Sequence, residues 1–304
     1  MTIKQAPAGI LLVDKESGPT SHDLVGSLRR LLHMRRIGHC GTLDPLATGL
    51  MVMCVGRYTR LNPWLSGADK VYEAQLHLGA TSNTEDSEGV ITQSTVEREP
   101  QVDEIEQILT NFLGEVDQVP PTFSAIKIDG IRSHKLARAG KAKPLEPRRV
   151  RISQLVVRSY KYPKLELTVH CSKGTYIRAL ARDIGSALGC GAYLSALRRT
   201  AVGPMRVEDA LTVGQIEDLV ESGQLPSAFY STRSALTVLD AVDLDQEGQV
   251  LRFGHGNAIE LEAKTQDGEC AVYHPDGYLF GVGRIEAGQL KPTMVLVDAP
   301  ALGS

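Results

Sequence analysis

Apolar residues that run continuously or alternate with polar ones predict five strands in this chain. In the clearest of them Tyr72, Ala74, Leu76 and Leu78 share one face, while polar side chains occupy the other, as expected of a half-buried strand. The predicted strands cover residues 10–15, 50–55, 70–79, 150–157 and 165–171. Their number indicates a fold built on a sheet.

Apolar residues at helical spacing predict three helices between these strands. Thr20 and Ser21 can cap the first helix, and Gly114 and Gly189 end the second and the third. The apolar positions of these helices are Leu24, Val25, Leu28, Leu31 and Leu32, then Val102, Ile105, Ile108, Leu109, Phe112 and Leu113, then Ile177, Leu180, Ala181, Ile184 and Leu188. The fold class is therefore mixed α/β (α+β).

The remaining segments are interpreted from composition. Residues 80–92 are rich in Thr, Ser, Asn, Asp and Glu and predict an exposed loop. Regular patterns fade after residue 225, and short β-like pieces rich in glycine follow. We place a domain boundary near residue 240, between a first domain of residues 1–240 and a second of residues 241–304.

Composition is that of a soluble globular protein. The 304 residues are 42% hydrophobic and 23% charged, and no apolar run is long enough to span a membrane. The start of the chain lacks the apolar core of a signal peptide, so we expect a cytoplasmic location. The five cysteines are odd in number and form no Cys/His cluster, which favours neither disulfides nor a metal site.

Positive charge is concentrated in one segment although the net charge is −3. Residues 124–151 hold nine basic and two acidic side chains, whereas residues 241–304 hold ten acidic and four basic ones. With its glycines and prolines, the stretch of about residues 120–151 predicts a mobile, loop-rich insertion that contacts a polyanion. The basic residues we assign to RNA contact are Lys127, Arg132, Lys135, Arg138, Lys141 and Arg148.

One carboxylate has the surroundings of a fixed catalytic group. Asp44 lies in a loop between Gly41 and Gly49, followed by Pro45 and then by the buried strand predicted at 50–55. Pro45 disfavours helical geometry at Asp44, and a rigid loop beside a buried strand holds a side chain in one place. The ordinary alternative is a turn aspartate that bonds to its own backbone.

The stretch around Asp44 resembles the active-site loop of the TruB family of tRNA pseudouridine synthases. Cys40, in this loop, stands where Thr or Ser is usual in the family. Glu16, in the motif at the start of the chain, stands where the family usually has Pro. The resemblance covers roughly residues 8–210 at high specificity and is carried by five motifs. They are Asp14-Lys15-x-x-Gly18-x-Thr20-Ser21, Gly38-His39-Cys40-Gly41-Thr42-Leu43-Asp44-Pro45-Leu46-Ala47-Thr48-Gly49, the strand that begins at Tyr72, Lys173 to Arg178, and Tyr193 to Gly203. The insertion at Pro120-Pro121 also matches, with His134 in place of Tyr, and the end of the chain is similar to a PUA-like domain.

The resemblance assigns the catalytic role to Asp44. Arg178 would then hold Asp44 ionised and oriented, and Tyr176 is a candidate proton carrier. Tyr72 offers a face on which an extruded uracil can stack. Leu197 could wall the uracil pocket, and His39 could contact substrate or displace the target base. Each of these five residues has a structural alternative. Arg178 could be a solvated arginine, Tyr176 could pack the helix start, and Tyr72 could be a core tyrosine. Leu197 could be a leucine of an amphipathic helix, and His39 could be a structural histidine.

The resemblance implies a pseudouridine-synthase fold with a largely antiparallel sheet, the basic insertion and a small β-rich C-terminal domain. The expected reaction converts uridine 55 in the T-arm loop of tRNA to pseudouridine. Every atom of the product is already in the substrate, so we expect no cofactor and no metal. Beyond tRNA we expect no obligate protein partner and no membrane, and a monomer.

Three alternatives remain open. One is a relative that is guided by a separate RNA within a ribonucleoprotein. A second is an RNA-binding or tRNA-folding protein in which catalysis is secondary or lost. A third is an aspartate-nucleophile hydrolase, for which no paired acid or metal set accompanies Asp44.

Overall fold

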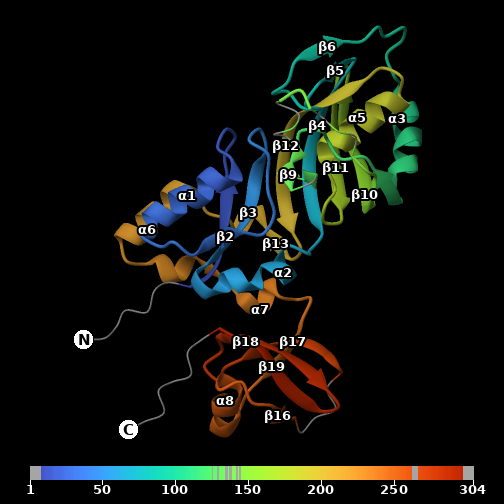
Figure 1. Ribbon diagram of the computed structural model, residues 1–304. Helices are drawn as coiled ribbons and strands as arrows, with labels where there is room; N and C mark the ends of the chain where they lie inside the picture. Colours follow the sequence, from blue (N-terminus) through green and yellow to red (C-terminus); the bar gives the residue numbers. More distant parts are fainter. Residues whose placement is uncertain are drawn as a thin grey trace.

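The computed structural model describes residues 8–261 and 266–296, except 125, 129, 134–135, 137–138, 142 and 144. The described part forms an N-terminal body around a ten-stranded sheet and a smaller C-terminal unit around a five-stranded sheet (Figure 1). The C-terminal unit lies at one end of the N-terminal body. The predicted mixed α/β class is confirmed.

The large sheet has the strand order β14-β1-β3-β12-β4-β11-β10-β7, with β2 on β3 and β13 on β12. Its named pairs are antiparallel except for β12 and β3, which run parallel and pair only at Arg198–Thr48 and Arg199–Gly49. This short joint connects two halves of the sheet. The strands are β1 (Gly9–Lys15), β2 (Ile37–His39), β3 (Thr48–Val55), β4 (Lys70–Leu78), β7 (Gly114–Gln118), β10 (Arg148–Lys161), β11 (Lys164–Cys171), β12 (Ala192–Val202), β13 (Met205–Arg206) and β14 (Phe229–Tyr230).

Four helices cover one face of this sheet. Apolar residues of α1, α3, α5 and α6 share a single buried cluster with the inward residues of the strands, among them Met51, Leu76 and Val169. Thr20 caps α1 as expected, because its side chain accepts a hydrogen bond from the amide of Asp23. The helices are α1 (Ser21–Leu31), α3 (Val102–Leu109), α5 (Ile177–Ala187) and α6 (Val213–Glu221).

Two short helices, α2 and α7, and the C-terminal unit, which includes α8, lie on the opposite side. There, a second apolar cluster joins Leu50 and Val52 of β3, Leu65 of α2, and Tyr273 and Val282 of the smaller sheet. The elements are α2 (Asn62–Leu65), α7 (Thr232–Ala235), α8 (Glu247–Gly254), β15 (Asp240–Asp243), β16 (Ile259–Glu260), β17 (Gly268–Tyr273), β18 (Leu279–Glu286) and β19 (Gln289–Val295). The 3-10 helices are η1 (Gly56–Leu61), η2 (Thr110–Phe112), η3 (Val207–Asp209) and η4 (Leu225–Ala228). The two units thus share apolar core.

The expected exposed loop at 80–92 is wrong in part. Residues at its two ends pair as a hairpin of β5 (Ala80–Ser82) and β6 (Ile91–Gln93). Within it Asp86 is only 3% exposed, because it forms an ion pair with Arg178. A polar composition does not reveal such a long-range partner.

Leu197 lies in the middle of strand β12, so the structural alternative for this residue, a leucine of an amphipathic helix, is wrong. The strand has irregular register between Leu194 and Ala196 and again between Arg199 and Ala201. The first irregularity shifts the two-residue alternation, so buried Leu194 and Leu197 are three residues apart, whereas Leu197, Arg199 and Ala201 are buried at the usual spacing of two.

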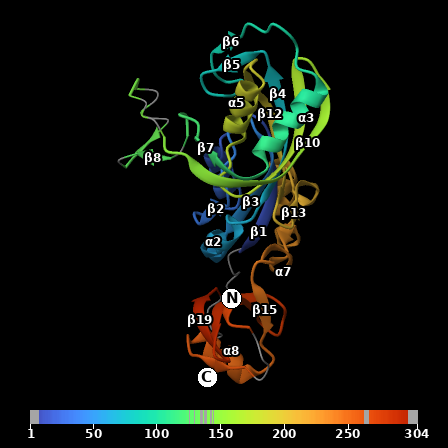
Figure 2. The same ribbon diagram turned by 90° about the vertical axis from the view of Figure 1, so that its right-hand side faces the viewer.

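A second small hairpin projects from the N-terminal body in the side view of Figure 2. It consists of β8 (Lys127–Ile128) and β9 (Ile131–Arg132) and belongs to the predicted insertion. Among the described residues, no helix is both long and apolar enough to cross a bilayer.

Candidate active site

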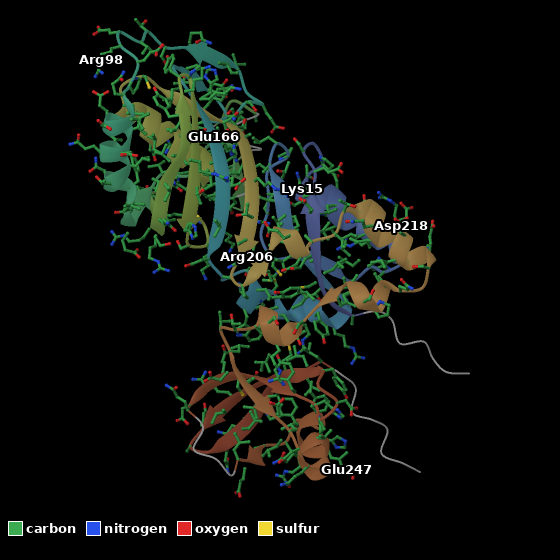
Figure 3. The ribbon with its side chains drawn as sticks, turned by 180° about the vertical axis from the view of Figure 1, so that it is seen from behind. Lys15, Arg98, Glu166, Arg206, Asp218 and Glu247 are labelled. Carbon is green, nitrogen blue, oxygen red and sulfur yellow. The ribbon has the colours of Figure 1, made fainter. Side chains whose placement is uncertain are left out.

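Asp44 lies in the loop between β2 and β3, and neighbouring segments hold that loop from two sides. The Ser21 hydroxyl, at the start of α1, donates to the Leu43 carbonyl and accepts from the Leu43 amide, at 2.8 and 2.9 Å. The ammonium group of buried Lys15 donates to the carbonyls of Ala47 and Pro45, at 2.7 and 3.1 Å. In Figure 3 Lys15 lies between the half of the sheet that carries Glu166 and helix α6 with Asp218.

Arg178 contacts two carboxylates at once. Its Nε lies 2.9 Å from Asp44 Oδ2 and its Nη1 lies 3.3 Å from Asp86 Oδ2. Its guanidinium also donates to the carbonyls of Thr84 and Phe123, at 3.0 and 3.1 Å. The Arg178 side chain is 6% exposed, whereas that of Asp44 is 35% exposed. The arrangement therefore fixes the carboxylate of Asp44 while leaving it accessible.

The predicted residues His39, Asp44, Tyr72, Tyr176, Arg178 and Leu197 all line one cleft of about 1080 Å³. They come from β2, the loop that follows it, β4, the start of α5 and β12. The volume is large enough for a nucleotide removed from its stack. The structure thus brings together residues that are far apart in the sequence.

Tyr176 immediately precedes α5, and its backbone is held by one side chain. The Gln118 amide accepts from Tyr176 N at 2.8 Å and donates to Tyr176 O at 3.1 Å. Burial raises the pKa of the Tyr176 phenol above its ordinary value. Tyr176 is therefore protonated at neutral pH.

His39 and Tyr72 are both affected by burial and by the cation of Arg199. Burial, with Arg199 as a second cause, lowers the pKa of His39, so this imidazole is neutral at pH 7. Burial raises the pKa of Tyr72, and Arg199 opposes that shift. Tyr72 is 8% exposed on the inward face of β4 and still lines the cleft.

The sequence analysis missed two functional candidates, Asp86 and Arg199. Asp86 shares Arg178 with Asp44. Arg199 is 1% exposed and bonds to the backbone on both sides of Asp44. Arg199 stands in the Tyr193 to Gly203 motif, but nothing in the sequence distinguished it from its neighbour Arg198, and no pattern marks Asp86.

The basic residues assigned to RNA contact are placed only in part. Lys127 and Arg132 are paired residues of the β8–β9 hairpin, while Lys135 and Arg138 lie outside the described residues. Lys141 and Arg148 are exposed. Against the larger effect of burial, which raises the pKa of the Tyr176 phenol, the positive charge of Arg148 lowers that pKa.

No three His, Cys, Asp or Glu side chains of the described residues gather as metal ligands. The chemically distinctive groups of the cleft are the carboxylates, Arg178 and the two phenols. Such a set can stabilise charge, attack an electrophilic carbon and carry protons.

Comparisons with family models cover most of the chain. Residues 29–177 match the model described as TruB family pseudouridylate synthase (N terminal domain). Residues 178–239 match the tRNA pseudouridylate synthase B C-terminal domain, and residues 241–296 match Pseudouridine synthase II TruB, C-terminal.

Relatives and solved structures agree with these matches. The chain is 42% identical to tRNA pseudouridine synthase B of Dechloromonas aromatica, with 93% of each chain covered. It is also 42% identical to the protein of that name from Syntrophotalea carbinolica, with 85% of this chain and 87% of the relative covered. Its structure is similar to a chain in the crystal structure of a Cbf5-Nop10-Gar1 complex, with a TM-score of 0.74, 25% identity, and 96% and 85% of the two chains covered. The chain therefore belongs to the TruB family of pseudouridylate synthases.

Proposed function

We propose that this protein isomerises uridine 55, in the T-arm loop of tRNA, to pseudouridine, with Asp44 as the catalytic residue and without a cofactor. The observation that carries the proposal is the Asp44–Arg178 ion pair in a cleft that Tyr72, Tyr176 and Leu197 also line. Relatives at about 40% identity over nearly the whole chain are named tRNA pseudouridine synthase B, which supports tRNA as the substrate.

The reaction breaks the N1–C1′ bond of uridine and joins C1′ to C5 of the same uracil. The C5 proton then leaves to solvent and N1 gains a proton, so no atom or electron has to be supplied. An ionised Asp44 can attack the sugar or the base, or stabilise positive charge at C1′. Arg178 orients the Asp44 carboxylate, because its Nε lies 2.9 Å from Asp44 Oδ2.

The walls of the cleft suit a detached uracil. The Tyr72 ring provides a stacking surface, worth about 1–3 kcal/mol per base in other proteins. Leu197 excludes water on the β12 side, and His39, being neutral, can stack or donate one hydrogen bond without adding charge. Tyr176 holds a proton at neutral pH and is suited to pass one at the C5 or sugar position.

Substrate binding follows from the basic insertion. A uridine within a folded tRNA arm must leave its stack before Asp44 can reach it. Arg148 and Lys141 are exposed in that part of the chain and supply charge for phosphate contacts that locate the T-arm. The proposed second domain, residues 241–304, would add a further RNA contact as a PUA-like unit.

The test measures release of tritium from C5 of uridine in unmodified tRNA. Wild-type protein, treated with a chelator and without added cofactor, should release about one tritium label per tRNA, because a single uridine is modified. Asp44→Ala should lower the single-turnover rate by a factor of at least about 10³, as expected when a principal catalytic group is removed, and should still bind tRNA. A tRNA with cytidine in place of uridine 55 should release nothing.

Other outcomes distinguish the alternatives. Binding without release by the wild type would favour an RNA-folding protein. Release only after a second RNA is added would favour an RNA-guided relative. Full release by Asp44→Ala would sink the assignment of Asp44.

A further inference from the structure

Arg199 is a buried cation whose acceptors within the described residues are all uncharged. Its side chain is 1% exposed, yet its guanidinium contacts backbone carbonyls, the sulfur of Met51 and the hydroxyl of Tyr72. Removing a guanidinium from water costs several kcal/mol unless strong bonds offset it. An apolar side chain could fill this buried position without the cost of desolvating a charge. The role of Arg199 is therefore indicated by the groups to which its guanidinium bonds.

Three of its bonds reach both ends of the loop that carries Asp44. The guanidinium donates to the carbonyls of Gly41 and Thr42, before Asp44, at 3.1 and 3.4 Å. It also donates to the carbonyl of Leu50, after the loop, at 2.7 Å. One rigid planar group therefore fixes the separation of the two ends of the loop.

The backbone of Arg199 constrains the same loop. Arg199 pairs with Gly49 in the short parallel joint between β12 and β3. The approach is so close that a Cβ atom on Gly49 would lie 2.3 Å from the Arg199 carbonyl oxygen. Side chain and main chain of one residue thus set the position of the loop.

A further contact reaches the other wall of the cleft. Tyr72 is the partner of Arg199 in the β12–β4 register, and the guanidinium acts on its hydroxyl, where it opposes the rise in the pKa of Tyr72 that burial causes. This contact lies at the far end of the phenol ring, while the ring lines the cleft. Arg199 is thereby bonded to the half of the sheet that carries Tyr72 and to the half that carries Asp44.

We infer that Arg199 is a positioning residue that sets the separation between the Asp44 carboxylate and the Tyr72 ring. The inference rests on the proposed function, because it matters only if uracil stacks on Tyr72 while Asp44 acts. Lysine cannot replace Arg199 here, since a single ammonium with three donors cannot span the acceptors of a planar guanidinium.

The experiment compares Arg199→Lys with Arg198→Lys. Arg198 is its neighbour in β12 and forms a bidentate ion pair with Asp14, at 3.0 and 2.7 Å, away from the cleft. Arg199→Lys should lower the single-turnover rate of tritium release at least about 10-fold, since a misplacement of about 1 Å can cost about 100-fold. Its Kd for tRNA should stay within about twofold, and Arg198→Lys should leave the rate within about twofold.

A second variant keeps the test independent of folding defects. Tyr72→Phe removes only the hydroxyl that contacts Arg199 and leaves the stacking ring and the loop bonds of Arg199 in place. The single-turnover rate of tritium release should fall in Tyr72→Phe. In the double variant with Arg199→Lys, the fold-decrease in this rate should be smaller than the product of the fold-decreases in the two single variants, because both substitutions remove the same contact. Thermal unfolding of every variant checks that the proteins are folded.

The outcomes separate the two proposals. A wild type that releases no label overturns the proposed function and this inference with it. An active wild type in which Arg199→Lys and Arg198→Lys are equally active overturns the inference alone. So does an Arg199→Lys protein that only binds tRNA more weakly, or an unchanged rate in Tyr72→Phe.

Discussion

Three buried cations near the cleft, Lys15, Lys70 and Arg199, are held mainly by backbone carbonyls, unlike Arg178, which contacts two carboxylates. Lys70 donates to the carbonyls of Ser66 and Ala68 at 2.8 and 2.6 Å. Desolvation disfavours a charged lysine, and the pKa of Lys70 is lowered from 10.5 to about 8. Lys70 therefore titrates closer to neutral pH than an exposed lysine.

This pKa predicts how stability depends on pH. Between pH 8 and 9 the unfolded chain binds more protons at Lys70 than the folded chain does, so Lys70 contributes an increase of the free energy of unfolding with pH. The buried thiols of Cys171 and Cys270 contribute in the opposite direction, because burial raises the pKa of each from 9.0 to about 11. Urea unfolding at pH 8 and 9 measures the slope, and Lys70→Met should make it smaller. An equal slope in both proteins would contradict the assignment.

At the scale of single residues, the sequence predicted side chains within recognisable motifs and missed those defined by contact. Asp44 and Arg178 stand in motifs, and the structure places them 2.9 Å apart. Asp86 lies in a polar loop whose composition suggests solvent, and only the fold gives it Arg178 as a partner. Arg199 stands in the Tyr193 to Gly203 motif, but its role was not predicted, since its acceptors come from residues about 150 positions away.

At the scale of elements, glycine is required where β3 begins. Gly49 has a φ of +99°, and any Cβ atom there would meet the backbone of Arg199. Gly189, at the end of α5, has a φ of +72° but open space around it. The two positions share left-handed backbone and differ in crowding.

Gly49→Ala should therefore destabilise the protein more than Gly189→Ala. The cost at Gly189 should be about 1–2 kcal/mol, the strain of an alanine in this backbone region. At Gly49 the cost should exceed this, since a strand backbone cannot move aside, and tritium release should also slow. Urea unfolding and the single-turnover rate measure both effects. Equal losses at the two glycines would mean that the approach to Arg199 is not tight.

Strands and helices were predicted where burial follows a constant period. Strand β4 alternates without interruption, so its inward face, with Tyr72, was found from the sequence. Strand β12 has two irregularities of register, and the sequence did not predict it as a strand. The buried face of a strand or helix can therefore be predicted from the sequence only where buried and exposed residues alternate with a constant period.

At the scale of the whole molecule, charge is separated along the chain. The insertion is basic, whereas residues 241–304 have a net charge of −6. RNA binding should therefore depend on the insertion and weaken as salt rises, because bound cations are released from the phosphates.

Lys141→Gln and Arg148→Gln should each weaken tRNA binding and make its salt dependence shallower. The slope of log K against log salt should fall by up to about 0.9 for each phosphate that the variant no longer neutralises. Lys164→Gln, at the far end of the β10–β11 hairpin, is the control and should change neither quantity. Filter binding at several salt concentrations measures the slopes. Equal slopes in all three variants would place the RNA elsewhere.

The short joint between β12 and β3 has a consequence for the dynamics of the protein. Two residue pairs connect the halves of the large sheet, whereas longer ladders hold each half together internally. Regions with few shared hydrogen bonds open first under native conditions. The halves should therefore behave as separate cooperative units in amide hydrogen exchange, and their lowest-energy opening would part Asp44 from Tyr72 while both units remain folded.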